Sequence, residues 1–411
     1  MKRIVFGSCF FLVIMVCFIE QAQSWDLPFD ADILRIKFDH AGGNAVDIRK
    51  NYDDDITAPE WISGSKNDGF AYIKGQNNIT VQAKLCHNES GVNSIIMSTS
   101  TYGGTGIGNL NMTTVNFSGS QPDTSAYVTF NSDGSAPNSV KKNTFSWHWN
   151  LRGVNGELFD GGDTWYLIGS SVNHHCYTIL TTPQSPWNSM NVPWEIVLEK
   201  SCLWANNQTN ATGAANQITN SLYTSGFYYQ ISGYGGSGSV FYLGRFNSDI
   251  GQSKHVNCFD MGKAVTTYGN AIGCGLGLTK YGRILSGNPI NKCCNCIDPI
   301  GSTTVPTNNV GGWPKIDNDC RTYRWDVHAF SQSSSNYVWD ATLKYDTDSD
   351  PDNVEAAPPG CGSVIVPPVF NFILPTNVAE ATYINKLFDD YPDFGGPDPT
   401  WDKNCTITIM D

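Results

Sequence analysis

The stretch HVNCFDMGKAVTTYGNAIG, residues 255–273, decides the fold of the second half of the chain. Asn257 is a favourable N-cap, and Asp260 stands where the partner of a capping box belongs. Apolar residues then recur at helical spacing as far as Gly273, which predicts a helix whose first turn holds Cys258. Unpaired backbone N–H groups and the helix dipole stabilise an anion there, and the thiolate is the reactive form of cysteine. Cys258 is therefore a candidate nucleophile, and a structural half-cystine is the alternative.

A second stretch, YRWDVHAFSQSSSNYVWDATLKY at residues 323–345, predicts a hairpin of two strands around a serine-rich turn. Folding about this turn places His328 opposite the neighbourhood of Asp340. An imidazole that takes the thiol proton and a carboxylate that fixes the imidazole tautomer complete a nucleophilic triad with the cysteine. The two stretches together predict the catalytic residues Cys258, His328 and Asp340.

At these residues the chain resembles the transglutaminase-like superfamily, in which a cysteine at the start of a core helix is followed by histidine and aspartate on neighbouring strands. The order is kept, and WDAT at residues 339–342 is similar to the aromatic, Asp, small residue, Thr signature of the superfamily. The resemblance covers residues 194–345 and implies an α+β, papain-like catalytic domain. The step from His328 to Asp340 is shorter than in many members, and the connection from helix to hairpin is long and cysteine-rich.

The resemblance implies acyl transfer or hydrolysis on protein amide groups through a thioester at Cys258. An amine acceptor makes the protein a crosslinker, whereas water makes it a deamidase or cysteine peptidase, and the residues leave these alternatives open. The expected partner is a protein or peptide substrate, and no cofactor is required. The alternative from a different class is a non-catalytic cell-surface binding protein in which the triad is inherited but idle.

The donor to the oxyanion is a further open point. Eukaryotic transglutaminases use a tryptophan upstream of the cysteine, whereas the corresponding interval here offers tyrosines. They are Tyr223, Tyr228, Tyr229, Tyr234 and Tyr242. The backbone N–H of Cys258 is the expected donor.

The first half of the mature chain, residues 25–193, shows short strand-like runs separated by Gly, Asn, Asp and Pro clusters, which is typical of an immunoglobulin-like β-sandwich or of two small ones. The runs are 33–38, 79–85, 126–130, 144–149, 164–169 and 176–181. Three prolines between residues 183 and 193 mark a boundary, after which a helix is expected within residues 207–226. The predicted organisation is a β-rich domain at 25–193, a transglutaminase-like domain at 194–345 and an acidic extension at 346–411 that packs on the catalytic domain.

Residues 1–24 have the form of a secretory signal peptide. Lys2 and Arg3 precede an apolar run at 5–19, and the small residues Ala22 and Ser24 stand at the two recognition positions before a cleavage point after Ser24. No later segment reaches the roughly 20 apolar residues that a membrane span needs. The net charge of −13 and the lack of a basic stripe argue against nucleic acid as a partner. A secreted or extracellular protein without a membrane span in the mature chain is therefore expected.

Two of the thirteen cysteines lie in the leader, so an odd number remains. In an oxidising compartment this parity predicts disulfides with one thiol left over, as a nucleophile requires. Disulfides are also favoured over zinc for the cluster Cys293, Cys294, Cys296 and Cys320, because the spacing lacks paired CxxC motifs. The alternating aspartates at 346–352 leave calcium as an alternative, although Pro351 occupies the place of the turn glycine. No metal site is predicted.

Overall fold

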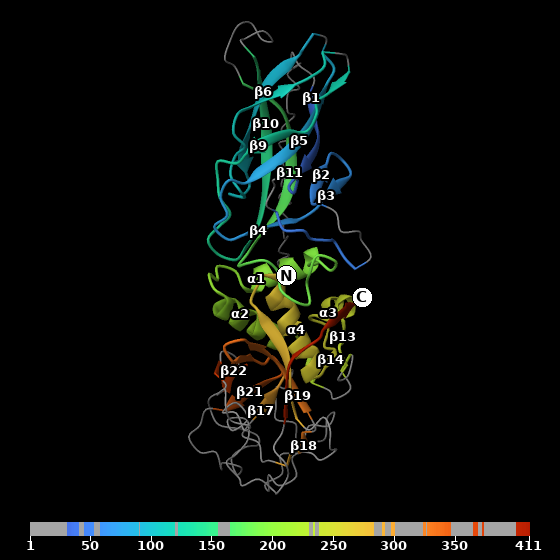
Figure 1. Cartoon of the computed structure of the whole chain (residues 1–411), viewed down its shortest axis with the longest axis vertical. Coiled ribbons are helices and arrows are strands. Elements are labelled where there is room, and N and C mark those ends of the chain that lie inside the picture. Colours follow the sequence, from blue (N-terminus) through green and yellow to red (C-terminus); the bar gives the residue numbers. More distant parts are fainter. Residues whose placement is uncertain are drawn as a thin grey trace, which may run out of the picture.

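The computed structural model has an elongated shape, with a strand-rich half at one end and a half of helices and strands at the other (Figure 1). It describes residues 31–40, 45–52, 58–89, 91–119, 122–154, 165–229, 233–234, 238–282, 290–291, 297–300, 324–325, 327–346, 365–368, 372–373 and 400–411. The leader at 1–24 and the cysteines at 293, 294, 296, 320 and 361 lie outside these residues.

The first half consists of two sheets. The six-stranded sheet has the order β3-β2-β1-β5-β8, with β9 also pairing with β5. Its strands are β1 (Ala31–Lys37), β2 (Glu60–Ile62), β3 (Lys66–Asn67), β5 (Thr80–His87), β8 (Asp123–Thr124) and β9 (Val128–Asn131). The five-stranded sheet has the order β4-β11-β10-β6-β7. Its strands are β4 (Phe70–Ile73), β6 (Ser94–Tyr102), β7 (Thr113–Asn116), β10 (Lys141–Gly153) and β11 (Tyr166–Ile179).

One long strand replaces two of the expected runs. The sequence divides residues 164–181 into two strand-like runs, but β11 is continuous from Tyr166 to Ile179. It pairs with β10 throughout, and the register shifts between Phe145 and Trp147. Asn173 takes a positive φ of 58° there, and its N–H donates to the Ser146 hydroxyl at 3.0 Å. The strand therefore continues through a β-bulge, at a segment where the sequence predicts a break between two strands.

Aromatic side chains fill the space between the two sheets, and His174 lies fully buried among them. Its ring centroid is 5.1 Å from that of Trp147 and 5.3 Å from that of Phe38. Nε2 shares a 2.8 Å hydrogen bond with the Ser171 hydroxyl, whereas Nδ1 has no partner among the described residues. Burial, with a smaller effect of the His175 charge, lowers the pKa of His174 from 6.5 to about 3. The imidazole is therefore a neutral core group.

Acid is expected to destabilise this core through His174. Because its pKa is about 6.5 unfolded and about 3 folded, its contribution is complete above pH 6.5 and is lost as the pH falls toward 3. At about pH 5 the expected loss is about 2 kcal/mol of unfolding free energy. Urea unfolding at about pH 7.5 and about pH 5 measures it, with His174→Gln as the non-titrating comparison. The same acid loss in both proteins would contradict the assignment to His174.

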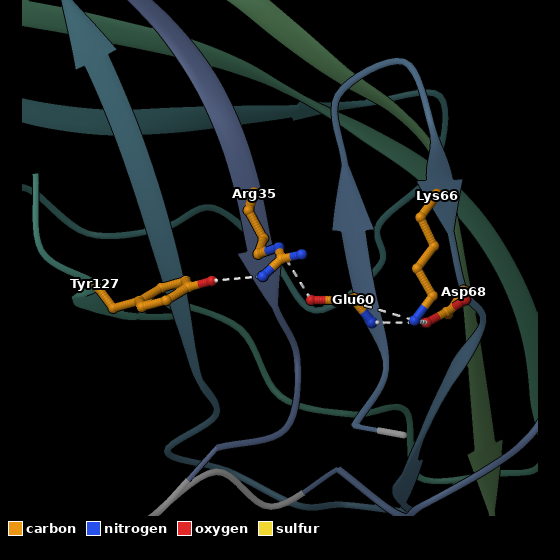
Figure 2. Close-up of polar contacts among 5 residues, drawn as sticks. All are labelled: Arg35, Glu60, Lys66, Asp68 and Tyr127. Atoms are coloured by element: carbon orange, nitrogen blue, oxygen red, sulfur yellow. Dashed lines mark hydrogen bonds and ion pairs between the residues drawn. The ribbon is translucent and has the colours of Figure 1, made fainter. Parts of the chain in front are cut away.

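A charged network on the outer face of the six-stranded sheet joins β1 to the β2–β3 hairpin (Figure 2). Arg35 Nε lies 3.2 Å from Glu60 Oε2, and its NH1 donates to the Tyr127 hydroxyl at 3.3 Å. Lys66 bridges Glu60 and Asp68 at 3.3 and 2.9 Å. The side chains of these ion pairs are 16–39% exposed, and ion pairs that solvent can screen contribute little to stability, so the network orders the sheet edge rather than holding the fold together.

The second half is built around a buried helix, α4 (Cys258–Ala271), whose side chains are buried at every position. Three helices accompany it: α1 (Glu195–Trp204), α2 (Ala211–Tyr223) and α3 (Leu243–Asp249). Figure 1 shows α4 at the centre of this half. The expected helix in 207–226 is present as α2, which begins at the Asn210 N-cap. The sequence did not indicate α1, because its apolar residues do not gather on one side of the helix.

A five-stranded sheet, ordered β23-β20-β19-β15-β24, packs against α4. Its strands are β15 (Leu276–Gly282), β19 (Val327–Ser333), β20 (Tyr337–Trp339), β23 (Phe372–Ile373) and β24 (Thr400–Cys405). Smaller sheets complete this half. They pair β12 (Tyr228–Tyr229) with β14 (His255–Val256), β13 (Val240–Tyr242) with β25 (Thr408–Met410), β16 (Ile290–Asn291) with β18 (Arg324–Trp325), and β17 (Ile297–Pro299) with β21 (Leu343–Asp346) and β22 (Ile365–Pro368).

One of the two hydrophobic cores extends across both halves. The end of β11 contributes Tyr177 and Ile179 to the apolar cluster that contains α1 and α4. The N–H of Leu180 donates to the carbonyl of Ile272 at 3.0 Å, just past the end of α4. Trp187 donates its indole N–H to the carbonyl of Thr267 inside that helix at 2.9 Å. The strand-rich half therefore braces the C-terminal end of α4, and the predicted division of domains at residue 193 stays a prediction.

The chain thus combines strand-rich N-terminal sheets with a region of helices and strands, which is a mixed α/β architecture. None of the helices in the described part of the chain has both the length and the apolar character that a bilayer crossing requires. Export and extracellular location stay predictions, because they rest on residues outside the described ranges.

Candidate active site

The N-terminus of α4 is fixed by the expected capping box. The Asn257 side chain accepts from the Asp260 N–H at 3.0 Å, and the Asp260 carboxylate accepts from the Asn257 N–H at 3.1 Å. Cys258 is the first helical residue and is only 5% exposed. Its thiol therefore sits at the positive end of a buried helix dipole.

Helix α4 lies unusually close to β19. A Cβ on Gly262 would come within 3.2 Å of the Phe330 nitrogen and 3.3 Å of the Ala329 carbonyl carbon. The Ser331 hydroxyl donates to the Gly262 carbonyl at 2.9 Å and shares a 2.8 Å hydrogen bond with Thr266. Because Gly262 lies one helical turn after Cys258, this contact sets the distance between the thiol and the strand that carries His328.

The hairpin of β19 and β20 brings His328 to Asp340. Residues Ser331 and Trp339 are paired across it, and Asp340 directly follows β20. His328 Nε2 lies 2.6 Å from Asp340 Oδ2, and both side chains are 1% exposed. The other carboxylate oxygen accepts from the Thr342 N–H at 2.7 Å. The carboxylate is therefore held from two sides, and the ring orientation is fixed.

The Cys258 thiol belongs to the same hydrogen-bonded group. Burial lowers the pKa of His328, but the charge and hydrogen bond of Asp340, with smaller effects of Cys258, outweigh burial and raise it from 6.5 to about 9. Because Nε2 faces Asp340, Nδ1 is the ring nitrogen available to the thiol. The structure thus brings all three predicted residues together, and their catalytic role stays a prediction.

Of the five tyrosines considered for the oxyanion, Tyr229 is the one placed at this site. Its strand β12 pairs with β14 immediately before the Asn257 cap, with Tyr229 opposite Val256. Burial and then the charges of Cys258, Asp340 and Asp260 raise its pKa well above 10. Tyr234 lies beside the start of α4, where its N–H donates to the Asp260 carboxylate at 2.8 Å, but its hydroxyl donates to Asp249. Tyr223 packs in the core, and Tyr228 and Tyr242 are exposed.

Two backbone N–H groups complete the polar surroundings of the thiol. The N–H of Asp260 goes to the Asn257 side chain, and the N–H of Met261 goes to the Asn257 carbonyl at 3.1 Å. Among the described residues, no group accepts a hydrogen bond from the N–H of Cys258 or of Phe259, since the first turn of a helix has no preceding carbonyl to receive these N–H groups. These donors can meet a negative oxygen formed next to the sulfur.

The odd number of cysteines predicts a single free thiol, but the described residues include several. Cys176, Cys202 and Cys274 carry free thiols, as Cys258 does. Burial raises the pKa of the first three, so they stay neutral and behave as apolar core atoms. Cys258 differs from the other free cysteines by its contact with His328, and the number of unpaired cysteines does not identify it. The four-cysteine cluster lies outside the described residues.

Within the described ranges, no group of three or more His, Cys, Asp or Glu side chains could hold a metal ion. Of the four alternating aspartates only Asp346 lies in those ranges, so the calcium alternative is not settled. Sequence reasoning missed Lys263, a lysine whose side chain is fully buried in α4. The signal was its place within a helix whose neighbouring positions are apolar or capping residues.

No family model matches this sequence, and no curated protein is similar to it. Among solved structures, that of red sea bream transglutaminase is similar over 67% of this chain and 48% of its own, with 10% identity and a TM-score of 0.29. The chain thus spans about half the length of that transglutaminase. The similarity is distant.

Proposed function

We propose that the protein is a secreted, transglutaminase-like cysteine enzyme that performs acyl transfer or hydrolysis on protein amide groups. The observation that carries the proposal is the buried His328–Asp340 pair, 2.6 Å apart, hydrogen-bonded to a thiol at a capped helix start. In this proposal the first half is an immunoglobulin-like sandwich and the second a papain-like α+β domain. Residues 346–411 form the acidic extension, and the signal peptide at 1–24 directs export.

The first half-reaction forms the thioester. A ring with a pKa of about 9 takes the thiol proton readily, giving an imidazolium beside a thiolate. The sulfur attacks the carboxamide carbon, and its oxygen becomes an oxyanion that meets the N–H of Cys258, with the Tyr229 hydroxyl as a second donor. When the C–N bond breaks, the imidazolium gives its proton to the leaving nitrogen, so ammonia departs from a primary carboxamide.

The second half-reaction restores the enzyme. An amine or a water molecule loses a proton to the His328 ring and attacks the thioester carbon. The C–S bond then breaks, and the sulfur recovers the proton from the ring. Asp340 stabilises the imidazolium in both halves. An amine gives a crosslinked or amine-labelled product, whereas water gives a carboxylate, and the same residues serve both outcomes.

Chemical labelling tests the proposed nucleophile. Iodoacetamide is expected to alkylate Cys258 in the native protein, and His328→Ala is expected to suppress this, because the ring no longer takes the thiol proton. A fluorescent primary amine should enter a glutamine-bearing protein, and Cys258→Ser should abolish incorporation. Cys274→Ser, at the other end of α4, is the matched control and should leave both unchanged.

The outcomes separate the alternatives. Ammonia or new N-termini without amine incorporation would favour the deamidase or the peptidase. A Cys258 that resists iodoacetamide in a protein whose fold is intact by circular dichroism would sink the enzyme proposal and favour a binding protein with an idle triad.

A further inference from the structure

One edge strand of the first half, β7, has neither a charged residue nor a proline on it or close to it. It is the last strand of the five-stranded sheet, and β6 is its one ladder partner among the described residues. Before the strand begins, the Asn111 N–H donates to the Asn131 carbonyl at 2.8 Å, and beyond this bond no described strand pairs with the free side of β7. The sequence from Gly103 to Gln121 contains no charge and no proline, and Met112 is 63% exposed.

Three other edge strands of the two sheets have protection that β7 lacks. β3 contains Lys66, and β8 contains Asp123. β4 is partly covered, because Val46 forms an isolated bridge with Ala71. A free strand edge is a template for pairing with another chain, and charged side chains or a covering segment are the common defences. The side chains of β7 supply no such defence.

Two sequons for N-glycosylation lie at the two ends of β7. The sequence NMT begins at Asn111, just before the strand, and the sequence NFS begins at Asn116, its last residue. Both asparagine side chains are exposed. Val115 is buried in the core, so its neighbour Asn116 faces outward. A glycan on either asparagine would therefore extend into solvent beside the free edge.

The sequon asparagines of this chain all have room for a glycan. The sequence contains seven Asn-x-Ser/Thr sequons, and each of the seven asparagines is exposed. The buried asparagines of the described residues all lie outside sequons, and they are Asn143, Asn257 and Asn270. An N-glycan is bulky and hydrated, so it requires a position at the surface. The fold meets this requirement at every sequon.

We propose that Asn111 and Asn116 are N-glycosylation sites whose glycans shield the uncharged edge of β7. The inference rests on the export that the proposed function includes, and it does not depend on the triad. The donor is an oligosaccharide linked to a lipid diphosphate. The asparagine amide nitrogen forms a bond to the anomeric carbon, the bond from that carbon to the diphosphate oxygen breaks, and the amide proton goes to a base of the transferase. A hydrated glycan at each end of β7 then keeps a second strand from pairing with it.

Mass spectrometry of the full chain secreted by eukaryotic cells tests the modification. Glycopeptides are expected at Asn111 and Asn116. Thr113→Val should remove the first glycan, whereas Thr113→Ser keeps the sequon and should keep the glycan. Unmodified asparagine at both positions in the secreted protein overturns the inference. A chain that retains its leader and is not exported overturns it as well, together with the proposed secretion, whereas loss of the cysteine chemistry alone changes neither glycopeptide.

The oligomeric state tests the shielding. The double variant Asn111→Gln/Asn116→Gln lacks both glycans and adds no charge, so its average mass by sedimentation should rise at least about twofold between micromolar and near-millimolar concentration. Asn111→Asp/Asn116→Asp also lacks the glycans but places charge at the edge, so it should stay monomeric, as the wild-type protein should. Thr209→Ala is the matched control, because it removes the sequon at Asn207 between α1 and α2, away from β7.

A monomeric Gln double variant over this concentration range overturns the shielding, and so does equal self-association of the Gln and Asp double variants. If the Gln double variant is not secreted, an endoglycosidase that leaves one neutral sugar on each asparagine makes the comparison on the folded wild-type protein. The trimmed protein is expected to self-associate, and trimmed protein that stays monomeric overturns the shielding.

Discussion

Asp340→Asn is expected to lower kcat/KM for amine incorporation by about a thousand- to ten-thousandfold. The carboxylate accepts from His328 Nε2 and thereby leaves Nδ1 free to serve the thiol. An amide in its place can present its NH2 group to Nε2, which favours the opposite tautomer. The imidazolium formed in each half-reaction also loses its counter-ion in a site that is 1% exposed.

The same substitution should shift the pH profile downward. In the wild-type protein the pKa of His328 is about 9, so the proton that the leaving group needs is present up to about that pH. Asp340 is the main reason that the pKa is raised, and burial acts against it. Without the carboxylate, burial dominates and the alkaline limb of kcat should fall at a lower pH.

The contribution of His328 to the free energy of unfolding decreases as the pH rises. Its folded pKa lies above the unfolded value of 6.5, so its contribution is complete below pH 6.5 and is lost as the pH rises through about 9. Asp340→Asn should therefore flatten this alkaline loss. Asp68→Asn, in the surface network of Figure 2, is the control for removal of a carboxylate. If Asp340→Asn kept the wild-type kcat/KM for amine incorporation and the wild-type pH profile, Asp340 would have no part in the mechanism.

The features that the sequence revealed are those governed by local chemistry. The helix start at Cys258 could be predicted because Asn257 and Asp260 form a capping box whose members are three residues apart. The hairpin that carries His328 and Asp340 could be predicted because a polar turn joins two strand-like runs. Short-range hydrogen bonds fix both features, so the residues that make them are neighbours in the chain.

The features that the sequence did not predict depend on contacts between segments that are far apart in the chain. Tyr229 reaches the site because β12 pairs with β14 and because its N–H donates to Ile300, far along the chain. Lys263 is buried because β13 covers it, although a lysine in isolation favours solvent. The cysteine parity failed for a related reason, since tertiary burial keeps Cys176, Cys202 and Cys274 as thiols.

Gly262→Ala is expected to impair both stability and catalysis, although alanine is the better helix former. The added Cβ would lie 3.2 and 3.3 Å from backbone atoms of Phe330 and Ala329, which belong to a paired strand and cannot turn aside. Overpacking of this kind costs about 1–3 kcal/mol. The strain can be relieved only by moving α4 away from β19, which separates Cys258 from His328, so the rate of amine incorporation should fall at least about tenfold.

Gly269→Ala is the matched control on the same helix. Its Cβ would meet Leu276 Cδ1 at 2.9 Å and Cys274 Cβ at 3.5 Å, so its one tight contact is with the end of a flexible side chain. Both substitutions gain about 1 kcal/mol of helix propensity. The difference between their changes in unfolding free energy therefore reports the contact with β19. Urea unfolding and amine incorporation should show a loss at Gly262 and little change at Gly269. Equal behaviour would mean that the close approach of α4 to β19 does not set the distance between thiol and imidazole.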